Sequence, residues 1–194
     1  MKIRPNEIGF DFDGVIADTT AAFIRLACEK YDYCSFTAED ITSFAVEECL
    51  DMPSSTVNRI FLDILEDSLG SGLEPMADAV EVITTMAAQT RVTVITARHL
   101  HQPVADWFDR FFAPRTRNAI NLIAMGDHDD KLRYIQEHKL RYFVDDRAET
   151  CQLLAANEIQ PLVYDQPWNR NRHNLRTVAN WQEIRAMLRL PDEE

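Results

Sequence analysis

Five short strand-like runs, separated by helix-length segments, are the feature that most constrains the fold of this chain. The runs cover residues 7–12, 91–96, 120–125, 140–144 and 159–164. Segments with helical spacing cover residues 76–89, 103–112, 129–139, 147–157 and 179–190. Strands that alternate with helices join through right-handed crossovers, which build a parallel sheet covered on both faces. The pattern therefore predicts an α/β three-layer sandwich with a parallel, Rossmann-like sheet.

Residues 18–75 interrupt the alternation because they contain no convincing strand. Helical spacing predicts helices over residues 19–31 and 54–68, and a short third helix after Thr37. An insert at this point would overhang the carboxyl ends of the strands, where open α/β sheets bind ligands. We expect a core of residues 1–17 and 76–194, with residues 18–75 forming a small helical cap inserted after the first strand.

The composition excludes several classes of function. The chain has 20 Lys and Arg residues against 32 Asp and Glu, a formal net charge of −12, and no compensating basic stretch, which argues against a nucleic acid polymer as partner. Its five glycines fit neither the P-loop nor the G-x-G-x-x-G nucleotide motif. No apolar run is long enough to cross a membrane. We expect no nucleic acid polymer and no membrane as partner, and the sequence leaves the oligomeric state open.

The cysteines bear on the compartment. The sequence contains no Cys-x-x-Cys pair, and its first residues lead into no apolar signal core. We expect four free thiols in a reducing environment, and hence a cytoplasmic location. The four are Cys28, Cys34, Cys49 and Cys151.

Two pairs of aspartates follow strand-like runs. Asp11 and Asp13 share one face at the end of the first run, and Asp145 and Asp146 follow the run at 140–144. In a parallel sheet all four carboxylates reach the same edge, where they suit a hard divalent cation such as Mg²⁺. The alternatives are a surface turn for the first pair and an acidic helix start for the second.

Two groups suited to a phosphate complete this edge. Thr96 ends the second run and brings a hydroxyl, together with the backbone N–H groups that begin at Ala97. Lys131 lies in the first turn of a predicted helix, where a cation opposes the helix dipole and is better explained if it faces an anion. The alternative for Lys131 is a solvated side chain in an acidic loop.

The order of these four motifs resembles that of the haloacid dehalogenase-like (HAD) superfamily. Asp11-Phe12-Asp13-Gly14 is similar to the form found in its phosphatases. Within the superfamily the chain most resembles the 5'(3')-deoxyribonucleotidases and their bacterial relatives, through residues 11–18, the small cap, residues 73–76, 144–147 and a tail at 164–170 and 181–184.

The resemblance implies a mechanism. Asp11 would be the nucleophile that forms an aspartyl-phosphate, and Asp13 would protonate the leaving oxygen and then activate water. Mg²⁺ would be held by the Asp11 carboxylate, the Asp13 backbone carbonyl and Asp145 or Asp146. Neighbouring negative charge predicts that the pKa of Asp13 is raised, so that it can carry a proton.

The phosphate-side residues and the substrate follow from the same resemblance. Thr96, the backbone at Ala97 and Lys131 would bind the phosphoryl oxygens. The expected activity is Mg²⁺-dependent hydrolysis of a phosphomonoester, most closely that of a 5'-nucleotidase on (deoxy)nucleoside monophosphates. The alternatives are a phosphatase of another small metabolite, such as a sugar phosphate, and a phosphate-binding relative without turnover.

Other residues near the site allow two interpretations. The best-studied family members have an aromatic residue where Thr19 stands and an aromatic pair in the cap where Ser43 precedes Phe44, which leaves base stacking on the cap open. Phe44, Arg98 and Arg147 are candidate substrate contacts, the alternatives being cap core for Phe44 and salt bridges for the arginines. His99 and His101 are read as loop histidines rather than as a metal pair.

Overall fold

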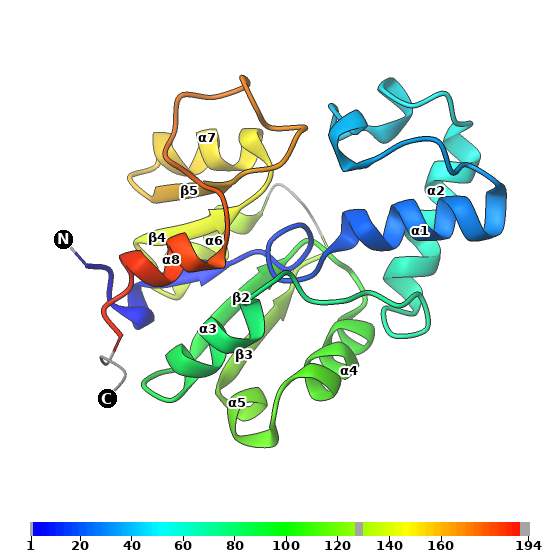
Figure 1. Ribbon diagram of the computed structural model, residues 1–194. Coiled ribbons are helices and arrows are strands. Elements are labelled where there is room, and N and C mark those ends of the chain that lie inside the picture. Colours follow the sequence, from blue (N-terminus) through cyan, green and yellow to red (C-terminus); the bar gives the residue numbers. More distant parts are fainter. Residues whose placement is uncertain (1, 127–129, 191–194) are drawn as a thin grey trace.

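The computed structural model describes residues 2–126 and 130–190, and its centre is a six-stranded parallel sheet (Figure 1). The strand order is β3-β2-β1-β4-β5-β6. The strands are β1 (Ile8–Phe10), β2 (Val92–Thr96), β3 (Ile120–Ala124), β4 (Tyr142–Asp145), β5 (Gln160–Tyr164) and β6 (Thr177–Val178). The parallel sheet and its five main strands are confirmed, whereas β6, with only two residues, is too short to give a periodic signal.

Helices cover both faces of this sheet, as the three-layer prediction requires. On one face lie α3 (Ala79–Ala87), α4 (His101–Phe111) and α8 (Trp181–Met187), and on the other α6 (Lys131–Glu137) and α7 (Ala148–Ala156) (Figure 1). The short α5 (Pro114–Ala119), which begins with a proline at its first position, was not predicted. The predicted helix at 129–139 begins at Lys131, and its residue 129 lies outside the described residues.

Each face of the sheet has its own hydrophobic cluster. Phe10 and Phe12 point into the larger cluster, which contains Trp107 of α4 and Trp181 of α8. The smaller cluster joins Ile95 and Phe143 to residues of α6 and α7. A Cβ on Gly9 would lie 2.6 Å from Leu140 Cδ1 and 3.1 Å from the ring of Phe143, so a larger residue at this position would have to displace the second layer packed against β1.

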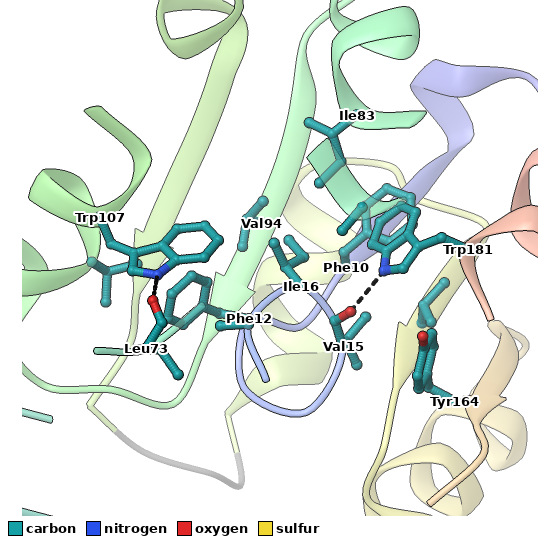
Figure 2. Close-up of a cluster of buried hydrophobic side chains, with 14 of the residues drawn as sticks. Phe10, Phe12, Val15, Ile16, Leu73, Ile83, Val94, Trp107, Tyr164 and Trp181 are labelled. Carbon is teal, nitrogen blue, oxygen red and sulfur yellow. Dashed lines mark hydrogen bonds between the residues drawn. The ribbon is translucent and has the colours of Figure 1, made fainter. Parts of the chain in front are cut away.

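The two tryptophans also position the loops around the site. The indole of Trp181 donates a hydrogen bond to the carbonyl of Val15 (2.8 Å), and that of Trp107 to the carbonyl of Leu73 (2.7 Å) (Figure 2). Val15 belongs to the loop that follows β1, and Leu73 to the chain that returns from the insert. Both segments are therefore attached to the larger cluster at the edge where the aspartates lie.

Helices fill the segment after β1, which is consistent with a cap. It contains α1 (Thr19–Tyr31), the 3-10 turns η2 (Ala38–Asp40) and η3 (Val46–Glu48), and α2 (Ser54–Glu66); a third 3-10 turn, η1 (Pro5–Glu7), precedes β1. The larger cluster continues into the insert through residues such as Phe23 and Ile60, so the insert packs on the rest of the chain. The helix expected after Thr37 is only the single turn η2.

The expectation of four free thiols is wrong for two of the cysteines. Cys28, near the end of α1, forms a disulfide with Cys34, at a Cα–Cα distance of 4.4 Å. The turn at Asp32, which adopts φ 62°, brings them together, and a spacing of six residues gave no recognisable motif. Cys49 and Cys151 are free thiols. None of the described helices is long and apolar enough to cross a membrane.

Candidate functional site

Three aspartates meet at the carboxyl edge of the sheet. Asp11 follows β1, Asp145 ends β4 and Asp146 comes next, and one carboxylate oxygen of each lies within 4.8 Å of the others. The backbone N–H of Asp11 donates to the carbonyl of Val144 (2.8 Å), which continues the pairing of the two strands up to the site. The convergence of motifs more than a hundred positions apart is thus a consequence of the parallel pairing of β1 with β4.

The turn after Asp11 leaves room for this cluster. Gly14 adopts φ +68°, and a Cβ there would collide with the carboxylate of Asp146. The side-chain amide of Gln166 donates to the Gly14 carbonyl (2.9 Å), and Asn169 donates to the Asp146 carbonyl (2.7 Å). The tail loop after β5 therefore braces both the glycine turn and the second aspartate pair.

Lys131 is the cation of the cluster. Its Nζ lies 2.9 Å from Asp11 Oδ2 and 2.6 Å from Asp145 Oδ2, and its side chain is almost fully buried. Although burial alone would favour the neutral amine, the carboxylates of Asp11 and Asp145 raise the pKa of Lys131 above its ordinary value. Lys131 begins α6 as predicted, and it faces anions rather than solvent.

One lysine does not balance three buried carboxylates. Burial, together with the charges of Asp145 and Asp13, raises the pKa of Asp11 to about 7 against the pull of Lys131. The pKa of Asp146 is raised well above its ordinary value, first by burial and then by Asp145 and Asp11. A hard cation bound by these oxygens would balance the negative charge that raises the pKa values of Asp11 and Asp146. The three carboxylates fit a divalent ion such as Mg²⁺.

The side chain of Asp13 points to a different partner. Arg98 grips it with two hydrogen bonds, Nε to Oδ2 at 2.8 Å and Nη2 to Oδ1 at 2.7 Å, and the hydroxyl of Thr19 donates to Oδ1 at 2.6 Å. Burial would raise the pKa of Asp13, but Arg98 and Thr19 outweigh it and the pKa is lowered. The expectation of a raised pKa is therefore wrong, because it counted the neighbouring aspartates and not these donors.

The phosphate-side residues lie at the same edge. Thr96 ends β2 and is buried, and its hydroxyl accepts a long hydrogen bond, 3.3 Å, from the backbone N–H of Arg98. Ala97 lines the cavity beside the site, next to Arg98 and Gly126. Their expected role toward phosphate stays a prediction.

A cavity of about 420 Å³ opens beside Asp13 and Asp146. Its wall on the insert side is mostly apolar: Phe23 comes from α1, and Phe61, Ile64 and Leu65 come from α2. The polar side chains on this wall are few, and two are already engaged, Thr19 by Asp13 and Ser43 by Glu48 (2.7 Å).

The three candidate substrate contacts have different surroundings. Phe44 lines the cavity and is 46% exposed, with the guanidinium of Arg147 stacked 5.1 Å from its ring centre. Arg98 also lines the cavity, but its guanidinium is bonded to Asp13 and to the insert. His99 lies at the cavity, and within the described ranges no metal-capable group includes it or His101.

The salt-bridge alternative for Arg98 is confirmed, but sequence reasoning did not identify Asp13 as its partner. An arginine two residues beyond Thr96 at the same edge was a usable signal, because a buried carboxylate there needs a donor. Thr19, six residues after Asp13, is expected at the start of a helix and departs from the aromatic residue of the resembled family, and neither feature indicates a donor to Asp13. Ser68, which accepts from Arg98, gave no signal because it lies in an irregular segment after α2.

Known proteins share this fold. The chain is 12% identical to a haloacid dehalogenase-like family protein from Streptococcus pneumoniae, with a TM-score of 0.59 over 92% of this chain and 96% of that one. At this identity the likeness establishes the HAD-like fold alone.

Proteins related in sequence indicate the family more specifically than the shared fold does. The chain is 24% identical over 193 residues to a nucleotidase-like protein of Bacillus cereus, covering 92% of this chain and 95% of that protein. It is 23% identical over 179 residues to a nucleotidase of Clostridium acetobutylicum, covering 91% and 90%. The family model described as 5' nucleotidase, deoxy (pyrimidine), cytosolic type C protein matches residues 4–191. Together with the acidic edge of the sheet, this match shows that the chain belongs to that NT5C family of nucleotidases, which are phosphatases.

Proposed function

We propose that this protein is a Mg²⁺-dependent phosphomonoesterase that acts on (deoxy)nucleoside monophosphates through an aspartyl-phosphate. The observation that carries the proposal is the buried group of Asp11, Asp145 and Asp146, paired with Lys131 and adjoining an apolar cavity. In this proposal residues 1–17 and 76–194 form the catalytic core and residues 18–75 the cap.

Asp11 is the proposed nucleophile. Lys131 at 2.9 Å favours its carboxylate form, which is the form that can attack phosphorus. The attack forms an oxygen–phosphorus bond and breaks the bond from phosphorus to the leaving oxygen. Thr96, the N–H groups from Ala97 onward and Lys131 would hold the phosphoryl oxygens while charge shifts among them.

Asp13 moves the proton. It gives a proton to the leaving oxygen, and it then takes one from the water that attacks the aspartyl-phosphate. Arg98 and Thr19 keep Asp13 ionised in the free protein, which suits the second step. For the first step, the negative charge of an arriving phosphate raises the proton affinity of Asp13.

The three carboxylates, together with the Asp13 backbone carbonyl, are the proposed metal ligands. Mg²⁺ bound there would neutralise negative charge on the phosphoryl group and let an acidic protein accept an anion.

The cavity wall supports a nucleoside as the leaving group. Aromatic and aliphatic side chains from α1 and α2 suit the flat face of a base, whereas the hydroxyls of a sugar would find few free partners there. The cytosolic location proposed for this chain is supported by the description of its family. The expected four free thiols no longer support it, because two of the cysteines form a disulfide.

The test is a substrate panel. Purified protein is assayed for phosphate release from nucleoside monophosphates and from sugar phosphates, with Mg²⁺ and with a chelator. We expect release that requires Mg²⁺ and a higher kcat/KM for nucleotides. Metal-independent release would contradict the mechanism, and equal rates for the two groups of substrates would contradict the substrate assignment.

A further inference from the structure

Arg98 is a buried cation that lies outside the carboxylate cluster. Its side chain is 2% exposed, and the guanidinium stacks on the ring of Phe12, 4.9 Å from the ring centre. Two of its nitrogens grip the Asp13 carboxylate in a two-point fork. This geometry fixes the orientation of the carboxylate as well as its position, which a single lysine nitrogen could not do.

The third nitrogen of the same guanidinium reaches the insert. Nη1 donates to the hydroxyl of Ser68 at 2.6 Å and lies 3.4 Å from the carbonyl of Ile64. Ile64 belongs to the last turns of α2, and Ser68 follows that helix. One planar group therefore joins the loop after β1 to the end of α2.

The end of α2 also forms part of the cavity wall. Phe61, Ile64 and Leu65 line the cavity on one side, and Asp13 lines it on the other. Arg98 thus binds both Asp13, which would contact the oxygen of a leaving group in the cavity, and the end of α2, which would contact the rest of that leaving group. Small errors in the placement of a proton donor cost large factors in rate.

We propose that Arg98 is a positioning residue that ties the Asp13 carboxylate to α2, and so aims Asp13 at the leaving oxygen of a substrate seated in the cavity. The inference rests on the proposed function, in which Asp13 protonates that oxygen. Ser68 is the anchor of the tie on the α2 side, and Arg98 itself need not touch the substrate.

The experiment compares two leaving groups. The leaving group of a nucleoside 5'-monophosphate is the nucleoside, a strongly basic alkoxide that needs a proton, whereas the leaving group of nitrophenyl phosphate is a weakly basic nitrophenolate that hardly needs one. In a reaction through an aspartyl-phosphate, kcat/KM reports the steps up to departure of the leaving group, so the ratio of the two values isolates protonation by Asp13.

Four variants give the readout. We expect Asp13→Asn to lower kcat/KM for the nucleotide by about 10²-fold more than for the aryl ester. We expect Arg98→Lys to show about a tenfold selective loss and Ser68→Ala about a threefold one, because both leave Asp13 in place and loosen its aim. Ser71→Ala is the matched control: its hydroxyl is buried in the same loop and donates to the Ser68 carbonyl (2.9 Å), not to Arg98.

A further measurement distinguishes a change in the orientation of Asp13 from a change in the binding of the leaving group by the cavity. The inhibition constant of the product nucleoside reports the cavity alone, and we expect it to be the same in the parent, Ser68→Ala and Ser71→Ala. The proposal is overturned if Ser68→Ala changes the ratio no more than Ser71→Ala does, or if the nucleoside constant weakens by the same factor as kcat/KM. If Asp13→Asn shows no leaving-group selectivity, the proposed role of Asp13 fails first, and the role of Arg98 fails with it.

Discussion

The carboxyl edge of the sheet and the insert wall of the cavity that adjoins it at Asp146 differ in their chemistry. The sheet edge is a set of buried charges, Asp11, Asp145, Asp146 and Lys131, held within a few ångströms by strand pairing. The insert side is a wall of aromatic and aliphatic groups in which Phe23 and Phe61 stack 4.9 Å apart. We therefore expect a change on the charged side to alter the rate of the proposed reaction, and a change on the apolar side to alter which substrate binds.

The largest expected effect lies at the charged edge. Asp11→Asn keeps the shape of the side chain and removes the nucleophilic carboxylate, so we expect kcat on nitrophenyl phosphate to fall by about 10³-fold or more. Phosphate release at saturating Mg²⁺ is the measurement, with circular dichroism to check that the variant is folded. An Asn variant as active as the parent would remove the covalent intermediate from the scheme.

The ion pairs of the sheet edge are buried, whereas those of the insert lie on the surface. Substitution of one lysine in each region tests what this difference contributes. Lys131→Met leaves Asp11 and Asp145 without their cation, so we expect about a 10²-fold loss of activity and a drop in unfolding free energy of about 3 to 5 kcal/mol. Lys30→Met is the matched control, because its pair with Asp63 (2.8 Å) lies on the surface of the insert, where such pairs contribute about 0 to 1 kcal/mol. Urea unfolding and the nitrophenyl phosphate assay measure both. Equal losses in the two variants would mean that the buried ion pairs of the sheet edge contribute no more than a surface pair.

The apolar wall is expected to give a smaller and more selective effect. Phe61→Ala removes a ring that lines the cavity, so we expect kcat/KM for a nucleoside monophosphate to fall roughly tenfold, mainly through KM. The inhibition constant of inorganic phosphate should stay unchanged, because phosphate would bind at the sheet edge. Leu62→Ala, on the neighbouring residue that is 40% exposed, is the control and should leave both constants as they are. A weaker phosphate constant in Phe61→Ala would show that the two sides are not separable.

The same contrast explains what could be predicted from the sequence. The aspartates and Lys131 were found because each follows a strand or begins a helix, and the parallel topology alone brings such positions to one edge. The sequence places Arg98 near the site, but its hydrogen bonds to Asp13 also depend on how the guanidinium is held by Ser68. Ser68 lies in an irregular segment that has no periodicity to reveal it.

The lining of the apolar wall could not be derived in the same way. It depends on how α1 and α2 pack together, and that register leaves no signature in composition or spacing. The same holds for the two-residue strand β6 and for the Cys28–Cys34 disulfide, whose partners are joined by the turn at Asp32 rather than by a motif.

The smallest expected effect on activity lies at the far end of α1. The Cys28–Cys34 disulfide closes a loop with a sequence separation of only six, for which chain entropy gives a stabilisation of about 2 kcal/mol. We expect Cys34→Ser, or reduction of the parent, to lower the unfolding free energy by that amount and to leave kcat/KM for a nucleoside monophosphate unchanged, because the bond lies near the end of α1 opposite Thr19. Cys49→Ser, which removes a free thiol, should retain the full sensitivity to reductant. If reduction instead lowers kcat/KM, the packing of the insert affects the charged edge. In that case α1 would contribute to catalysis as well as to substrate binding, and the two regions could not be separated.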